Sequence, residues 1–255
     1  MLGSIKEKRK DFELAISEIG KFIINNKKKI RIINKKKFQS NLDIEVNEKI
    51  KNRINYFFLN KNFLSEEDNI YKVPQSNYWL IDPIDGTRSL YDGYKTYGIQ
   101  LCYVIDKKPV YSVINLPETN KNVSSLINEG VRINGKKFNK NYNLKHQVIV
   151  DNHEIPINEC KNIMKSCNIK RYIEAGSFAY KSMLIALNKA TLFVKNVKFC
   201  AWDIFPQLLI NNELGNHTFD LKGKKFDLIN KLNYSDGLIV TSKKSNIKKI
   251  TKLFR

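Results

Sequence analysis

Two carboxylates three positions apart, Asp82 and Asp85, follow an apolar run at residues 79–81. Because Pro83 and Gly86 interrupt strands, we expect both aspartates at the exposed end of a strand. Two carboxylates aimed at one point repel each other unless a cation lies between them or one is protonated. Carboxylate oxygens suit Mg²⁺ or Mn²⁺. The stretch predicts a divalent-cation site, and the alternative is a plain strand end followed by an Asp-Gly turn.

Further acids lie far from this stretch in the sequence. Glu66 is the first of three consecutive acids that follow an apolar pair, and Asp203 follows Trp202. Asp203 also precedes a helical pattern, where a carboxylate is an ordinary cap. Together with Asp82 and Asp85, these residues supply enough carboxylate for a cluster of two or three metal ions.

These motifs resemble those of the lithium-sensitive, magnesium-dependent phosphatase superfamily, which includes inositol monophosphatases and 3′(2′),5′-bisphosphate nucleotidases. The Asp-Pro-Ile-Asp-Gly-Thr signature occupies residues 82–87, and the Trp-Asp signature occupies residues 202–203. The resemblance runs from about residue 40 to residue 240. It implies a metal-dependent phosphatase that is sensitive to lithium and acts on a small phosphorylated substrate.

The resemblance also implies a set of metal ligands. One Mg²⁺ would be held by Glu66, Asp82 and the backbone carbonyl of Ile84. A second would be held by Asp82, Asp85 and Asp203, so that Asp82 bridges the two ions. Glu66 would share a third, weaker ion, and Mn²⁺ is an alternative metal.

Catalytic roles follow from the same resemblance. Glu66 would position the attacking water, and Thr87, polarised by Asp43, would orient that water. Asp43 stands three residues after Ser40 at the start of a helical pattern, so a helix-capping role is the alternative. The N–H groups of Gly86 and Thr87 would face the phosphate.

The substrate-binding residues implied by the resemblance are Gly86, Thr87, Arg88, Gly176, Ser177, Lys181 and Asp203. Lys181 would contact a second phosphate, although a surface lysine is an equally good interpretation. Arg88 and the acids after Ser65 favour the bisphosphate nucleotidase branch, and therefore removal of the 3′-phosphate of adenosine 3′,5′-bisphosphate. The alternatives are an inositol or sugar monophosphatase and, more remotely, an inactive basic binding protein.

The formal net charge of the 255 residues is +20. The lysines are scattered among Asn and Ile residues, and there is no basic-aromatic interleaving, so we expect no specific nucleic-acid partner. No apolar run reaches the roughly 18 residues of a membrane span, and no secretory signal is recognisable. The four cysteines show no Cys-x-x-Cys spacing and are typical of reduced thiols. We expect a cytoplasmic protein, with a homodimer as a possible assembly.

The elements that position these residues alternate between helical and strand patterns. Apolar residues recur at helical spacing over residues 5–26 and again after Ser40. Residues 97–105 and 109–116 form a predicted strand hairpin. A second unit of strands and helices begins near residue 147. We expect an α/β (α+β) fold, a layered αβαβα sandwich of the sugar-phosphatase type. It would have two fused lobes: residues 1–145 with most ligands, and residues 146–255 with Asp203 and the substrate pocket.

Overall fold

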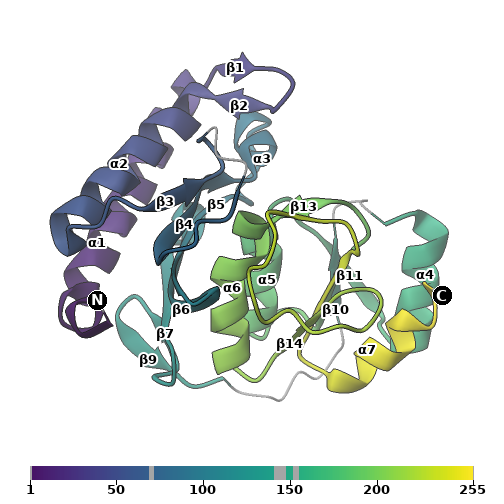
Figure 1. Ribbon diagram of the computed structural model, residues 1–255. Coiled ribbons are helices and arrows are strands. Elements are labelled where there is room, and N and C mark those ends of the chain that lie inside the picture. The colour runs from purple at the N-terminus through teal and green to yellow at the C-terminus, as the bar shows by residue number, and fades with distance from the viewer. Residues whose placement is uncertain (1, 69–71, 141–147, 152–154, 255) are drawn as a thin grey trace.

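The computed structural model describes residues 2–68, 72–140, 148–151 and 155–254. Helices and sheets alternate in five layers (Figure 1). Helices α1 and α2 cover one face of a seven-stranded sheet, α5 and α6 lie between the two large sheets, and α4 and α7 cover the outer face of a five-stranded sheet. This αβαβα sandwich confirms the predicted fold class.

The seven-stranded sheet runs in chain order from β3 to β9, with β3 parallel to β4 and every later pair antiparallel. Its strands are β3 (Phe63–Ser65), β4 (Tyr78–Asp85), β5 (Gly98–Ile105), β6 (Lys108–Leu116), β7 (Lys121–Leu126), β8 (Val131–Ile133) and β9 (Lys136–Phe138). The predicted hairpin of residues 97–105 and 109–116 is β5 paired with β6.

Two amphipathic helices cover the outer face of this sheet because their apolar positions recur at helical spacing. Helix α1 (Leu2–Asn26) buries Phe12, whose ring packs against Trp79 of β4 at a centroid distance of 5.4 Å. Helix α2 (Asn41–Phe58) packs beside α1 and begins with a capping box between Ser40 and Asp43.

The five-stranded sheet has the order β11-β10-β12-β16-β14. Its strands are β10 (Val148–Asp151), β11 (Arg171–Glu174), β12 (Leu192–Lys195), β14 (His217–Phe219) and β16 (Leu238–Thr241), and its outer helices are α4 (Ile157–Cys167) and α7 (Lys244–Thr251). Two small ribbons pair β1 (Ile32–Asn34) with β2 (Gln39–Ser40) and β13 (Phe199–Cys200) with β15 (Asn233–Tyr234).

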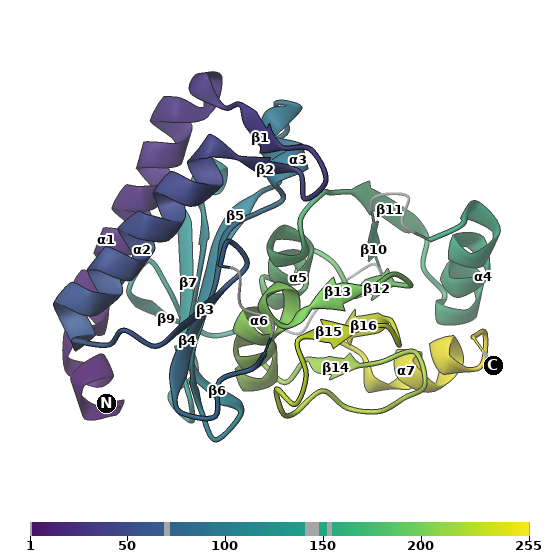
Figure 2. The ribbon, with the colours of Figure 1, turned by 45° about the horizontal axis from the view of Figure 1, so that its top comes forward.

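The middle layer joins the two large sheets. Helices α5 (Phe178–Ala186) and α6 (Ala201–Glu213) lie between them in both views (Figures 1 and 2). A single apolar cluster contains Leu80 of the first sheet, Phe205 of α6 and Phe193 of the second sheet. The lobe boundary at residue 145 lies outside the described residues, so that division stays a prediction.

None of the helices in the described ranges is both long enough and apolar enough to cross a lipid bilayer.

Candidate active site

Strand β4 carries both aspartates of the first motif. Asp82 pairs with Gln100 of β5, and the register of the ladder shifts between Asp82 and Asp85. Pro83 lies at this irregularity and has no N–H to donate to the ladder. The expected exposed strand end is corrected here: β4 continues to Asp85, and both carboxylates are buried because the middle helix layer covers this face.

Gly86 ends the strand and starts the short helix α3 (Thr87–Tyr91). Its φ of +91° is a conformation that side-chain-bearing residues rarely adopt. A Cβ atom on Gly86 would also lie 2.7 Å from the Cβ of Ser177. Glycine is therefore required by the turn and by the approach of the loop before α5, a reason that the sequence did not indicate.

Asp203 lies in the first turn of α6. The helix begins at Ala201, earlier than the sequence pattern indicated, and the Cys200 N–H donates a 2.6 Å hydrogen bond to Asp203 Oδ2. The carboxylate thus makes the capping contact that was considered as an alternative. The same capping contact fixes the direction of the side chain toward β4.

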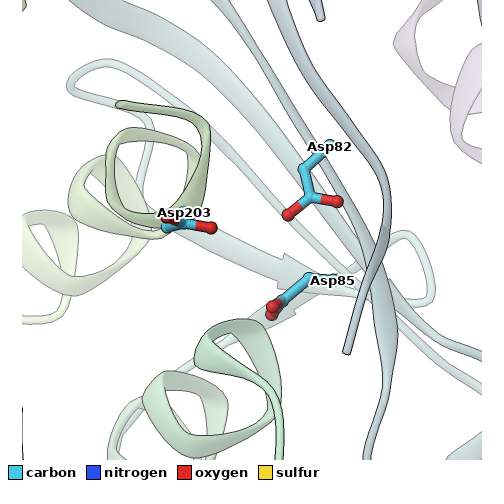
Figure 3. A group of neighbouring side chains, drawn as sticks. All are labelled: Asp82, Asp85 and Asp203. Carbon is cyan, nitrogen blue, oxygen red and sulfur yellow. The ribbon is translucent and has the colours of Figure 1, made fainter. Parts of the chain in front are cut away.

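Figure 3 shows the three aspartates close together: Asp82 of β4 and Asp203 of α6 face each other, and the Asp85 carboxylate is directed toward the start of α5. Each of Asp82, Asp85 and Asp203 offers an oxygen, and these oxygens lie within 4.8 Å of one another. Glu66 follows β3 and lines the same pocket, and its charge acts on Asp82. The fold thus brings together four acids from three separate parts of the sequence.

Burial and mutual repulsion dominate the electrostatics of this cluster. Burial raises the pKa of Asp82 well above its ordinary value, and the charges of Glu66, Asp85 and Asp203 raise it further. The pKa of Asp85 is raised by burial, but hydrogen bonds from the start of α5 and the charge of Lys195 oppose this. Such a cluster favours the binding of either protons or cations.

The donor set fits a hard divalent cation. Asp82 Oδ1 is buried and has no hydrogen-bond partner in the described part of the chain. A buried carboxylate oxygen without a partner is costly, and a coordinated cation would satisfy it. The residues present could therefore hold a metal ion between β4 and α6.

A hydroxyl–carboxylate pair lies next to the cluster. Thr87 Oγ1 lies 2.8 Å from Asp43 Oδ1 and 3.0 Å from the carbonyl oxygen of Ile84. The other Asp43 oxygen accepts bonds of 2.6 Å from both the N–H and the hydroxyl of Ser40. Burial raises the pKa of Asp43, and these hydrogen bonds oppose the rise. Asp43 thus caps α2 and contacts Thr87 at the same time.

A pocket of about 400 Å³ opens above the cluster. The sequence-predicted residues in its wall are Glu66, Asp82, Ile84, Asp85, Gly86, Thr87, Arg88, Gly176, Ser177 and Asp203. Asp43 lies behind Thr87. Ser177 caps α5, and Gly176 is close-packed because a Cβ atom there would overlap the Ser89 hydroxyl.

The structure does not place Lys181 in the pocket wall, so its contact with the substrate stays a prediction, and the alternative of a surface lysine is wrong. Lys181 is fully buried on α5, and its Nζ lies 5.0 Å from the ring centroid of Phe193, outside the pocket lining. The sequence did not single out Lys195, whose Nζ lies 3.6 Å from the ring centroid of Phe178 and which lines the pocket. Lysine ends an apolar strand there, and no local motif indicates that this strand reaches the site.

Residues of the β1–β2 hairpin also line the pocket, which the sequence did not predict. The Arg88 guanidinium lies 3.6 Å from the ring centroid of Phe38, and the Phe38 ring packs edge-on against Tyr91. Phe38 and Lys37 belong to the pocket wall. The hairpin therefore borders the site together with α3.

Fold and site together define the class of this protein, a metal-dependent phosphatase. The sequence model of the protein family described as "Inositol monophosphatase family" matches residues 6–255, so the chain belongs to this family. The sequence is 26% identical over 201 residues to the fructose-1,6-bisphosphatase/inositol-1-monophosphatase of Thermotoga maritima. The aligned region covers 78% of this chain and 77% of that relative.

Two solved structures share the fold. A staphylococcal inositol monophosphatase-1, soaked in LiCl as an inhibitory complex, superposes with a TM-score of 0.83 at 20% identity and covers 99% of this chain and 95% of its own. An IMPase/NADP phosphatase complexed with Mg²⁺ and phosphate superposes with a TM-score of 0.77 at 20% identity. The superposition covers 91% of this chain and 90% of that structure. The superfamily inferred from the sequence is confirmed, whereas the closeness to bisphosphate nucleotidases stays a prediction.

Proposed function

We propose that this protein hydrolyses a small inositol or sugar phosphomonoester by attack of an activated water on phosphorus. The observation that supports the proposal most directly is the convergence of Asp82, Asp85 and Asp203 beside the Thr87–Asp43 pair. The bifunctional fructose-bisphosphatase and inositol-monophosphatase name of the Thermotoga maritima relative points to the same substrate class.

Magnesium is the metal of this enzyme, in agreement with the all-oxygen donor set and with the relative complexed with Mg²⁺ and phosphate. We assign Glu66, Asp82 and the Ile84 carbonyl to one ion and Asp82, Asp85 and Asp203 to another. When bound, the metal neutralises the phosphate, lowers the pKa of its bound water and stabilises the leaving oxygen.

The chain itself orients the water and accepts its proton. Thr87 Oγ1 donates its hydrogen toward Asp43 Oδ1, which leaves an oxygen lone pair to accept a hydrogen bond from the water. As the water oxygen bonds to phosphorus, its proton passes to Thr87 Oγ1 and the threonine proton passes to Asp43, while the P–O bond to the alcohol breaks and the leaving oxygen takes up a proton from solvent. The two bonds from Ser40 hold the carboxylate in this orientation.

A second candidate substrate is the 3′-phosphate of adenosine 3′,5′-bisphosphate. Two of the three cations in the pocket wall, Arg88 and Lys195, favour it because a second phosphate group needs a positive partner. Phe178 lies under one of these side chains and Phe38 under the other, which limits their freedom. This candidate differs from the first in the leaving group, and the metal site is the same.

The deciding experiment measures phosphate release from inositol 1-phosphate and from adenosine 3′,5′-bisphosphate, each with Mg²⁺, with EDTA and with Mg²⁺ plus LiCl. We expect Mg²⁺-dependent release that lithium inhibits. A higher kcat/KM for the inositol ester supports the first substrate, and a higher value for the nucleotide supports the second. Release that is unaffected by EDTA would overturn the metal-dependent proposal.

Asp85→Asn tests the ligand assignment. A bound metal ion stabilises the transition state by several kcal/mol. If the variant loses this stabilisation, we expect its kcat/KM to fall by about three orders of magnitude. The circular dichroism spectrum should stay that of the wild type. Retained Mg²⁺-dependent turnover would contradict the assignment.

The expected homodimer also stays a prediction, for which light scattering after gel filtration is the measurement.

A further inference from the structure

Gln100 is a buried amide that faces the carboxylate cluster. It lies on β5 directly opposite Asp82 in the ladder, and side chains of such a pair lie on the same face of the sheet. Its Nε2 donates a 3.1 Å hydrogen bond to Asp82 Oδ2 and a 3.4 Å bond to the backbone carbonyl of Asp203. One side chain therefore contacts two ligand-bearing residues that are far apart in the sequence.

The geometry gives this amide a defined orientation. Both Nε2 hydrogens are used on oxygens, and the reversed amide would place Oε1 against those same oxygens. The bond engages Asp82 Oδ2 and leaves Asp82 Oδ1 without a partner in the described part of the chain, as a metal ligand would require. Gln100 Oε1 is buried and also lacks a partner there, which costs stability.

We propose that Gln100 is a positioning residue for metal binding. Its amide fixes the rotation of the Asp82 carboxylate and ties the first turn of α6 to the seven-stranded sheet. Because Asp82 lies on β4 and Asp203 on α6, this tie sets the spacing between the two sides of the cluster that Figure 3 shows. The inference rests on the metal site proposed above.

A neighbouring amide separates this role from general packing. Gln207 of α6 is also fully buried, and its Nε2 donates to the Asp203 carbonyl oxygen. That bond lies within one helix, four residues apart, and no bond from Gln207 to Asp82 is among those described. Loss of the Gln207 amide should therefore affect metal binding less than loss of the Gln100 amide.

The test is direct Mg²⁺ titration of the substrate-free protein by isothermal calorimetry, paired with thermal unfolding with and without Mg²⁺. Gln100→Met keeps the length of the side chain and removes both donors. We expect its Mg²⁺ dissociation constant to rise 10- to 100-fold, which is about the effect of losing a hydrogen bond to a ligand. Its Tm in EDTA should fall below that of the wild type, because loss of the donors leaves the buried Asp82 Oδ2 without this partner, which outweighs the removal of the unsatisfied Oε1.

Ser112→Ala is the matched control, because Ser112 is buried in the adjacent strand β6 and its hydroxyl has no partner in the described part of the chain. It should bind Mg²⁺ as the wild type does, and Gln207→Met should weaken binding less than Gln100→Met. If Gln100→Met does not fold, Gln100→Asn replaces it: the amide is too short to reach both oxygens, and at least a tenfold weakening is expected.

The outcomes separate the two proposals. Folded Gln100 variants that bind Mg²⁺ within threefold of the wild type would overturn the positioning role. Equal weakening in Gln100→Met and Gln207→Met would also overturn it. A wild-type protein that binds no Mg²⁺ would instead overturn the metal site itself.

Discussion

At the scale of single residues, Asp43 combines two roles that the sequence presented as alternatives. One of its oxygens accepts two hydrogen bonds from Ser40, and the other faces the Thr87 hydroxyl. A carboxylate has two oxygens with about four acceptor positions, so capping and polarising do not compete. The cap fixes the carboxylate that the proposed chemistry uses.

Thr87→Val should separate the two roles. Valine keeps the shape and removes the hydroxyl, so the water loses its acceptor and the route to Asp43. We expect kcat/KM to fall by about 10²- to 10⁴-fold, the usual range for lost acid–base assistance. The measurement is phosphate release under saturating Mg²⁺, with the Mg²⁺ dissociation constant unchanged in calorimetry.

Ser40→Ala is the companion variant on the capping side. The loss of an N-cap hydroxyl should cost about 1 kcal/mol in the free energy of unfolding. Since the Ser40 N–H still holds Asp43, turnover should fall much less than in Thr87→Val. A loss of activity in Ser40→Ala as large as that in Thr87→Val would contradict the separation of the capping role of Asp43 from its catalytic role.

Single residues also show where sequence reasoning stops. Asp82, Asp85 and Asp203 stand in recognisable motifs, and the fold brings them together. Lys181 and Lys195 show the limit of local motifs. Which of these two lysines reaches the pocket depends on how α5 and β12 pack against the rest of the molecule. Gln100 likewise becomes meaningful only when β5 is paired with β4 in register.

At the scale of elements, periodicity predicted the helices and the β5–β6 hairpin because apolar spacing is a local signal. The boundaries at the site were less predictable. Helix α6 begins before Asp203, and β4 extends through Pro83 to Asp85, because tertiary contacts rather than local residue preferences decide where each ends. The site lies where such boundaries meet.

Gly86 and Gly93, which flank α3, provide a matched test of these boundaries. Both have positive φ angles, +91° and +82°, but a Cβ atom would overlap Ser177 at the first and meets nothing within 4 Å at the second. Gly93→Ala should lower the free energy of unfolding by only about 1–2 kcal/mol, the strain of a side-chain-bearing residue at positive φ. Gly86→Ala should cost about 1–3 kcal/mol more through overlap, and it should also lower kcat/KM.

Urea unfolding monitored by fluorescence measures this difference. Equal losses of stability in the two variants would contradict the close approach of the loop before α5 to Gly86. A Gly86→Ala variant with wild-type turnover would contradict its place in the active site.

At the scale of the whole molecule, the carboxylate cluster lies between the seven-stranded sheet and the middle helix layer. Burial and repulsion raise the pKa values of Asp82 and Glu66 above those of the unfolded chain. For such groups, the contribution to stability is fully present below the unfolded pKa, near 4, and is lost as the pH rises through the folded value. In the metal-free protein, raising the pH toward neutrality therefore favours the charged forms of Asp82 and Glu66, and their mutual repulsion destabilises the contact between these layers.

This predicts a pH-dependent stabilisation by magnesium. In EDTA, the Tm should fall as the pH is raised from about 5 to 8. With saturating Mg²⁺, the fall should shrink or vanish, because the bound cation replaces the protons and stabilises the native state by mass action. Differential scanning fluorimetry across this range measures both curves, and the Mg²⁺-induced shift in Tm should grow with pH.

Asp82→Asn identifies the cluster as the origin of this behaviour. Removing the buried charge should raise the Tm of the metal-free protein at pH 8 relative to the wild type, because one source of repulsion is gone. The same change removes the proposed bridging ligand, so Mg²⁺ should no longer shift the Tm. A wild-type Mg²⁺ shift that is equal at pH 5 and pH 8 would mean that the ion does not replace protons at this cluster. The variant thus tests stability and metal binding in one measurement, because the buried Asp82 charge that destabilises the contact between the layers is also the proposed metal ligand.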